Sequence, residues 1–269
     1  MTNYILGTST LVRLASAAVL SISTCFLVTC FLVLAAGMAS AEENASNPLA
    51  SVNNLDFKWQ YVTTKDSVDR HDVFLDGALM LHPKLKFKYE LHYNFTDATG
   101  SDKNGFEKLV FKPIFFPTQA KLNDTWGMKT AVGLDWIIEF NNSEAKGIGV
   151  GADQLGPFVG LAFSHFQSKL VLIPLLQHFV SYRSSGSDRD INTTAMRLIA
   201  LLPFGEGYWA KLDAKVPYDW ENEKWVSTAE IQVGYNINQT VALFVDGLVG
   251  IGKDRPIDGG VALGLRFKY

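Results

Sequence analysis

The 269-residue sequence is poor in cysteine: Cys25 and Cys30 are the only two, and both lie within the first 41 residues. The rest of the chain therefore has no disulfide framework, no thiolate metal site and no cysteine nucleophile. The sequence also lacks a strong excess of charge, because 24 Lys and Arg against 27 Asp and Glu give a formal net charge of −3. This near balance argues against a nucleic-acid partner.

Charge is almost absent from residues 1–41, where Arg13 is the one charged side chain. It precedes an apolar run over 14–38, and Ala39-Ser40-Ala41 supplies the small residues of a cleavage site. We therefore predict a signal peptide over 1–41 and a mature chain that begins at Glu42. The run is long enough to cross a bilayer as a helix, so a retained anchor is the alternative. Residues 42–54 are polar and are predicted to form a flexible periplasmic lead-in.

Beyond residue 54 the sequence lacks a 3.6-residue apolar stripe of useful length and shows two-residue alternation instead, which is typical of β-strands. The clearest case is 84–95, where one face is apolar and the other carries Lys, Glu, His and Asn. The pattern predicts twelve strands, at 55–63, 73–82, 84–95, 107–116, 126–140, 155–164, 168–182, 190–202, 208–220, 225–237, 240–252 and 259–269.

The lengths of these strands and the residues at their ends distinguish a soluble sandwich from a membrane barrel. Aromatic residues gather at strand ends, as Trp126, Tyr208 and Trp220 do, which suits the aromatic girdles of a transmembrane barrel. Many strands exceed the length needed to cross the hydrocarbon layer. Longer connections, such as 64–72 and 141–154, alternate with mostly short turns. We predict an all-β fold over 55–269, a transmembrane antiparallel up-and-down β-barrel of about 12 strands, with the soluble sandwich as the alternative.

The last strand, VALGLRFKY, resembles the C-terminal signature by which bacterial outer-membrane barrels reach their assembly machinery. Its alternating residues are Val261, Leu263, Leu265, Phe267 and Tyr269. Residues 176–269, with AKVPYDWENE and VGIGKDRPIDGGVALGLRFKY, are similar to a poorly characterised group of transporter barrels labelled as resembling a MetA-pathway phenol-degradation protein. The resemblance implies the outer membrane of a Gram-negative cell, contact with lipid and lipopolysaccharide, and a pore-like role.

The positions of the histidines give little support for an enzyme. Barrel phospholipases and lipid A deacylases carry a His-x-Ser pair on one strand. No histidine of this sequence is followed by a serine two positions later; the five histidines are His71, His82, His92, His165 and His178. A barrel hydrolase with a nucleophile and a base from different strands is the third alternative. Asp66, Asp69, His71, Asp72 and Asp188 could gather at the outer rim, but charged loops are common for solubility alone. No catalytic, metal or cofactor site is predicted.

The inward face of the barrel carries the most informative residues. The alternation predicts that the following side chains face the lumen: Lys86, Lys88, Glu90, Lys129, Asp135, Glu139, Lys211, Asp213, Lys215, Asp219, Glu230, Asp246 and Arg266. Lys112, Arg197 and Lys268 share this face. Mutual pairing of these charges is expected whether or not the lumen is open. We therefore expect a passive channel for an unidentified small molecule, with a closed structural or binding barrel as the alternative.

Overall fold

The computed structural model describes residues 44–140, 144–184 and 190–269, so the predicted signal peptide lies outside the described residues. The described chain is almost entirely strands, with one short 3-10 turn, η1 (Glu144–Lys146). The strands are β1 (Asn54–Thr64), β2 (Asp69–His82), β3 (Leu85–Thr96), β4 (Lys103–Phe115), β5 (Gln119–Lys121), β6 (Trp126–Glu139), β7 (Ala152–His165), β8 (Val171–Ser184), β9 (Asn192–Phe204), β10 (Tyr208–Asp219), β11 (Lys224–Trp225), β12 (Ser227–Asn236), β13 (Val241–Ile251) and β14 (Ile257–Lys268). Among the described residues, no helix is long and apolar enough to cross a membrane.

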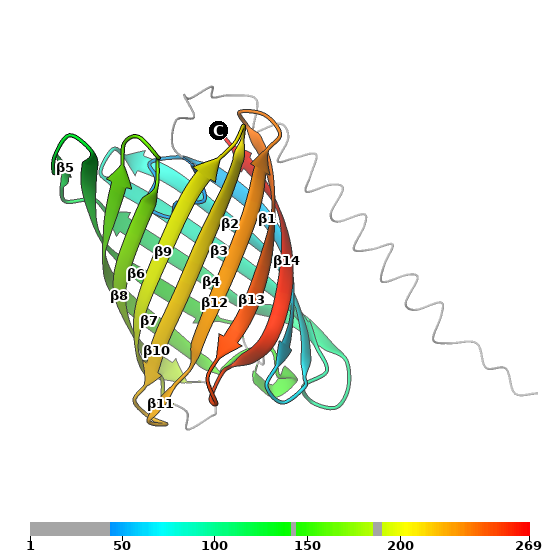
Figure 1. The fold of residues 1–269 in the computed structure, drawn as a ribbon. Coiled ribbons are helices and arrows are strands. Elements are labelled where there is room, and N and C mark those ends of the chain that lie inside the picture. Colours follow the sequence, from blue (N-terminus) through cyan, green and yellow to red (C-terminus); the bar gives the residue numbers. More distant parts are fainter. Residues whose placement is uncertain (1–43, 141–143, 185–189) are drawn as a thin grey trace, which may run out of the picture. The chain divides into compact units, whose positions relative to one another are not determined.

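The strands close into a barrel (Figure 1). Each long strand pairs antiparallel with its neighbours in the sequence, and β1 pairs with β14 from Asn54↔Lys268 to Thr64↔Ile257. The sheet has 14 strands, of which β5 and β11 are short pieces beside the ring. The remaining twelve confirm the predicted closed antiparallel barrel. Closure leaves no long strand with an unpaired edge, as a wall in contact with lipid requires.

The two ends of the barrel differ in their connections. Asn54 and Lys268 lie at one end, here called the N/C end, together with the turns 83–84, 166–170 and 205–207. The opposite end, here called the loop end, carries the connections 65–68 and 97–102 and the described residues 144–151, which precede β7. The loop predicted over 64–72 is shorter than expected, because Asp69 pairs with Thr63 as the first residue of β2.

The outer wall is apolar over its middle. Ile231 is 60% exposed and Leu263 is 53% exposed, and each lies near the centre of its strand. The residues before and after each of them are polar or small and point inward. The same face continues through Leu212, Val245, Met196 and Val159. A water-facing wall of this kind would be unstable against aggregation, whereas a bilayer covers it.

Aromatic contacts form a girdle near each end of the wall. At the N/C end, Tyr208 stacks between Phe204 and Tyr235, with ring centroids 5.8 and 4.6 Å away. At the loop end, Tyr218 contacts Trp220 and Trp225 at 4.7 and 4.9 Å. Amphipathic rings prefer the headgroup level, so the two girdles mark where the two interfaces of a bilayer would lie.

Residues 44–53 differ from the predicted flexible lead-in. They form two successive turns, in which the backbone N–H of Asn47 donates to the Asn44 carbonyl and that of Ala50 donates to the Asn47 carbonyl. Ala45, Leu49 and Ala50 are buried. The polar composition suggested disorder, but the lumen supplies partners for the polar groups and an apolar pocket for Leu49. We call residues 44–53 the N-terminal segment below.

Candidate functional site

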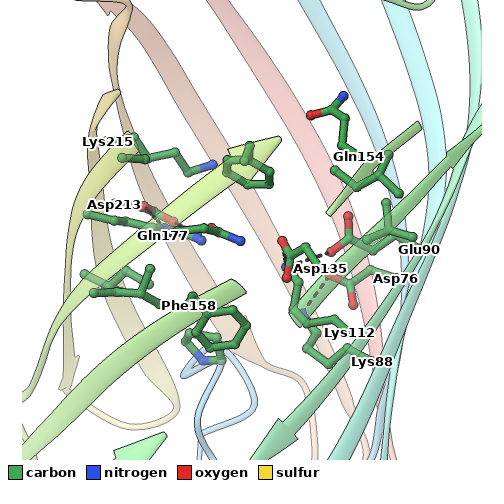
Figure 2. Close-up of a pocket in the computed structure, with 18 of the residues that line it drawn as sticks. Asp76, Lys88, Glu90, Lys112, Asp135, Gln154, Phe158, Gln177, Asp213 and Lys215 are labelled. Atoms are coloured by element: carbon green, nitrogen blue, oxygen red, sulfur yellow. Dashed lines mark hydrogen bonds and ion pairs between the residues drawn. The ribbon is translucent and has the colours of Figure 1, made fainter. Parts of the chain in front are cut away.

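The lumen contains a cavity of about 660 Å³ lined by side chains from most of the long strands. Figure 2 shows two facing walls, with Gln177, Asp213 and Lys215 on one side and Asp76, Lys88, Glu90, Lys112 and Asp135 on the other. The lining mixes both signs of charge. A lumen of this kind is wet and polar, in contrast to the outer wall.

Ion pairs between adjacent strands hold most of the charged side chains against the wall. The Lys112 Nζ lies 3.1 Å from the Asp135 carboxylate and 3.7 Å from that of Glu90. On the opposite side Arg197 forms a bidentate pair with Asp213. Paired charges of this kind orient one another and leave a reduced net field in the lumen.

A second group of pairs joins β1, β10, β12 and β13. The Lys58 Nζ lies 2.5 Å from Asp246 and 3.9 Å from Glu230, and Lys211 lies 2.9 Å from Glu230. Lys58 and Asp246 come from strands that are not adjacent, since β14 lies between β13 and β1. This pair therefore spans a neighbouring strand and fills part of the lumen.

Lys215 stands out among these charges because its side chain is exposed to the cavity. Within the described part of the chain no carboxylate lies within 4.0 Å of its Nζ. Its side chain points from β10 toward the open space between the two walls (Figure 2). Lys215 is therefore a cation that a solute in the cavity could contact directly.

The loop end is narrowed by residues 148–151, which directly precede β7. The Glu139 carboxylate accepts hydrogen bonds from the backbone N–H groups of Val150 and Gly151, each at 2.8 Å. The Arg70 guanidinium donates to the Ile148 carbonyl at 3.0 Å, and Ile148 is buried. These contacts hold 148–151 inward, so the loop reduces the opening at this end.

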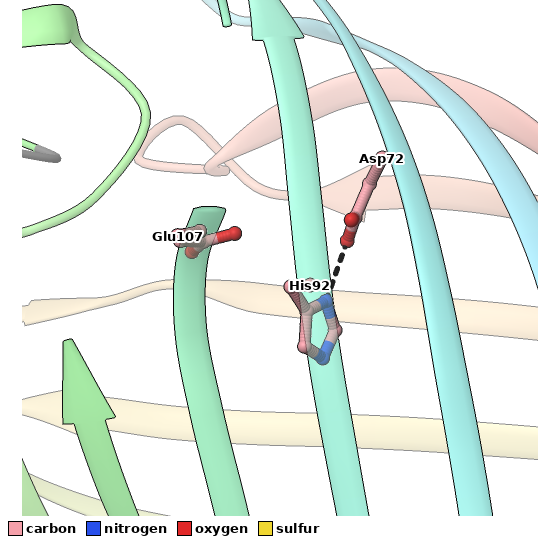
Figure 3. Close-up of side chains that lie close together, drawn as sticks. All are labelled: Asp72, His92 and Glu107. Carbon is pink, nitrogen blue, oxygen red and sulfur yellow. Dashed lines mark hydrogen bonds and ion pairs between the residues drawn. The ribbon is translucent and has the colours of Figure 1, made fainter. Parts of the chain in front are cut away.

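A cluster of possible metal ligands lies just below this loop (Figure 3). Asp72, His92 and Glu107 each offer one ligand atom within 4.8 Å of the others. Glu107 reaches the lumen because a bulge shifts the β3–β4 register between Leu91 and Tyr93 and turns this residue inward. Arg70 and Lys108 already contact its carboxylate at 3.2 and 3.0 Å. The three side chains could supply ligands to a cation, but Arg70 and Lys108 already neutralise the Glu107 carboxylate.

The N/C end of the lumen is filled rather than open. Trp209 is 1% exposed, and its indole N–H donates to Gln232 at 3.1 Å. Its ring fits because Gly234 lies opposite, where an added Cβ would approach the ring to 2.0 Å. A second apolar cluster surrounds Leu49 and consists of Ile114, Phe116, Ala131, Phe158, Ala162, Ile173 and Ile199.

The N-terminal segment completes this closure through polar contacts. Lys86 Nζ donates to the carbonyls of Pro48 and Ala50 at 3.2 and 2.8 Å. Lys129 Nζ donates to the Leu49 carbonyl at 3.1 Å and to the Ser51 hydroxyl at 2.6 Å. Ser46 lies near Gln232 and accepts a hydrogen bond from Arg266. The segment is therefore held by the wall of the lumen.

The sequence-predicted lumen residues fall into three groups. Nine line the cavity: Lys86, Lys88, Glu90, Asp135, Glu139, Lys211, Asp213, Lys215 and Arg266. Glu230 and Asp246 lie in the ion pairs around Lys58, and Lys129 contacts the N-terminal segment. Asp219 is different, because its carboxylate accepts from the backbone of Glu221 and Asn222 and caps the turn after β10.

Several lumen residues escaped sequence reasoning. Asp56 and Lys58 alternate with Leu55, Phe57 and Trp59, so the signal was present in the strand pattern. Glu107 had no such signal, because the bulge changes which residues of β4 point inward. A bulge of this kind depends on the pairing of two strands and not on one of them.

Four residues of the C-terminal signature, Val261, Leu263, Leu265 and Phe267, alternate along β14, and Tyr269 follows the end of the strand. Val261 and Leu263 are exposed on the outer wall, and Phe267 contacts Phe57 edge-on at 6.1 Å. Their alternation with Arg266, whose guanidinium lies inside, places apolar side chains on the lipid side of the strand. The assembly role itself stays a prediction.

Within the part of the chain that the structure describes, one hydrogen-bonded histidine–serine contact is present, in the turn between β7 and β8. His165 Nδ1 lies 2.8 Å from the Ser168 hydroxyl and also accepts from the Ser168 backbone N–H at 3.1 Å. The ring packs on Trp126 at 4.9 Å, and within the described residues no carboxylate contacts it. The contact therefore acts as a local cap of the turn, without the third group that orients a catalytic base.

Comparisons with known proteins support the fold. No protein-family model matches the sequence, and no curated protein matches it. Among solved structures, the COG4313 outer membrane channel from Pseudomonas putida F1 has a TM-score of 0.59 at 10% identity, covering 87% of this chain and 100% of that one. The NanC porin has 0.55 at 9%, covering 81% and 100%. The KdgM porin has 0.53 at 7%, covering 80% and 99%. The chain thus has the β-barrel fold of these outer-membrane proteins.

Proposed function

We propose that this chain is a passive channel of a bacterial outer membrane that admits small polar solutes to a charged lumen. The observation that carries the proposal is the contrast between the two faces of the wall: apolar and exposed outside, charged around a cavity of about 660 Å³ inside. A barrel that only anchored a structure would gain nothing from a wet, charged interior of this size. The likeness to outer-membrane channels and porins supports the same function.

The orientation follows from the two ends. The N/C end, with its short turns, would face the periplasm, and the loop end would face outside. The aromatic girdles around Tyr208 and Tyr218 would then lie at the two lipid interfaces. Lipid and lipopolysaccharide would contact the outer wall, and the assembly machinery would recognise β14.

A planar lipid bilayer tests this function. Purified barrel should give discrete conductance steps of small amplitude, because loop 148–151 narrows one end and the N-terminal segment fills the other. Reconstitution into liposomes should likewise admit small sugars or amino acids. Absence of conductance and of swelling, with the barrel folded, would favour the alternative.

That alternative is a closed structural or binding barrel. The extensive ion pairing along the wall of the lumen and the buried residues of the N-terminal segment favour it. The C-terminal resemblance to a group labelled after a phenol-degradation pathway implies a transporter barrel and leaves its solute unidentified. A barrel hydrolase is the least supported, given the missing His-x-Ser pair.

A further inference from the structure

The N-terminal segment presents an unusual set of acceptors to the lumen. Three consecutive carbonyls, those of Pro48, Leu49 and Ala50, receive hydrogen bonds from two lysine ammonium groups, Lys86 and Lys129. The lysines come from β3 and β6 and so approach the segment from different strands of the wall. The segment therefore offers a row of neutral oxygens where two positive charges converge.

Lys86 is the more deeply buried of the two lysines. It is 1% exposed, and in the described ranges it has no carboxylate within salt-bridge distance; its two hydrogen-bond acceptors are backbone carbonyls. The charges near enough to act on it are Lys88, Lys129 and Arg266, which are cations, and Asp76, which is paired with Lys88. A buried ammonium usually requires a charged partner, and carbonyl dipoles compensate it only in part.

Anionic oxygens would suit this position better than carbonyls do. A hydrogen bond between an ammonium and a carboxylate or phosphate oxygen is charge-assisted on both sides and is stronger than one to a neutral acceptor. The segment's other contacts come from single side chains: Leu49 fits the apolar cluster, Ser46 contacts Arg266 and Gln232, Ser51 accepts from Lys129, and Asn53 accepts from the Met80 backbone N–H at 2.7 Å. It adds no strand to the barrel, so its departure would leave every ladder intact.

We propose that residues 44–51 occupy an anion-binding site of the pore, and that Lys86 and Lys129 bind the anionic oxygens of a small carboxylate or phosphate solute when the segment withdraws. The segment competes with the solute for the same two ammonium groups. Its carbonyls hold the site in the empty barrel and narrow the N/C end. This inference rests on the proposed channel function and adds to it a solute class and a gate.

The test compares four mature barrels in planar bilayers: the full chain, a deletion of residues 44–50, and each of these with K86Q/K129Q. The deletion should raise the conductance severalfold and shift the reversal potential in a KCl gradient toward that of chloride. With K86Q/K129Q the deleted barrel should keep its larger conductance and lose the anion preference. K84Q is the matched control, because Lys84 lies two residues away with its side chain exposed, and it should leave selectivity unchanged.

Two probes separate the possible ligands. Inorganic phosphate and succinate, added on the N/C side, should each reduce the chloride current through the deleted barrel, and neither should do so with K86Q/K129Q. Block by phosphate alone identifies a phosphate site, and block by succinate alone identifies a carboxylate site. Block by neither overturns the anion site.

The outcomes also separate this inference from the channel itself. If no barrel conducts, the proposed channel function fails. If the full and deleted chains conduct equally, the channel stands and the segment is no gate. If the deletion does not fold, as shown by loss of its heat-dependent mobility in SDS gels, Leu49→Ser in the full chain replaces it. That variant should loosen the segment from its apolar pocket and raise the conductance in the same direction.

Discussion

The seam between the first and last strands depends on one buried ion pair, and its removal should destabilise the barrel strongly. Asp56 and Arg266 are register partners on β1 and β14, with side chains 6% and 8% exposed. The Arg266 Nε lies 2.8 and 2.9 Å from the two Asp56 oxygens, and Nη2 lies 2.5 Å from one of them. Arg266→Met keeps the apolar stem and leaves the Asp56 carboxylate buried without its partner. Such a change costs about 3–5 kcal/mol.

A second pair of the same chemistry provides the control. Arg255 and Asp258 lie 2.7 Å apart near the start of β14, but their side chains are 37% and 41% exposed. Water screens this pair, so Arg255→Met should cost at most about 1 kcal/mol. The double variant D56N/R266M should recover much of the loss, because no charge is then left buried.

Equilibrium unfolding in detergent or lipid vesicles at pH 8, followed by tryptophan fluorescence, measures these free energies of unfolding. The expected order is wild type and R255M most stable, D56N/R266M next and R266M least. Equal losses for R266M and R255M would show that the buried pair contributes no more than a surface pair. A double variant as unstable as R266M would show that the guanidinium matters through packing on Phe244, 5.1 Å away, and not through charge.

Three further predictions address the lipid face, the lumen and processing. Ile231→Arg, near the middle of β12, should lower the free energy of unfolding in lipid by about 2–4 kcal/mol. Thr228→Arg, on the cavity side of the same strand, should lower it much less. Equal unfolding midpoints for the two variants would reverse the assignment of faces. Lys88→Glu should move the reversal potential toward cations without loss of folding, because lumen charges set the field along a narrow pore; an unchanged potential would remove Lys88 from the ion path. N-terminal sequencing of the exported protein should begin at Glu42, and recovery of Met1 in the membrane fraction would support the retained anchor.

Strand positions were predictable because each barrel strand separates two different solvents. On β10, Leu212 is 40% exposed on the outer wall, while Lys211 and Asp213 on either side are ion-paired inside. The period-2 pattern this contrast produces is local, so the sequence alone reveals it. Both ends of most strands were therefore predicted to within a few residues of their observed bounds.

The features that sequence reasoning missed depend on contacts between distant residues. The inward turn of Glu107 follows from a bulge in the pairing of β3 with β4. The folding of the N-terminal segment follows from Lys86 and Lys129, which lie far along the chain from the carbonyls that they contact. The sequence around a strand lysine, or within a polar stretch such as 44–53, does not indicate which distant residue it will contact.

The two faces of the wall also divide the tasks of folding and function. Lipid discriminates poorly between one apolar side chain and another, so the outer face cannot by itself fix which strand lies beside which. The pairs inside can: Asp56 with Arg266 joins β1 to β14, and Asp213 with Arg197 joins β10 to β9. Charges bound in this way are held by a neighbouring strand. Lys86 and Lys129 beside the N-terminal segment and Lys215 in the cavity are the cations that we expect a solute to contact. Selectivity for anions should therefore depend on these positions and leave strand order untouched.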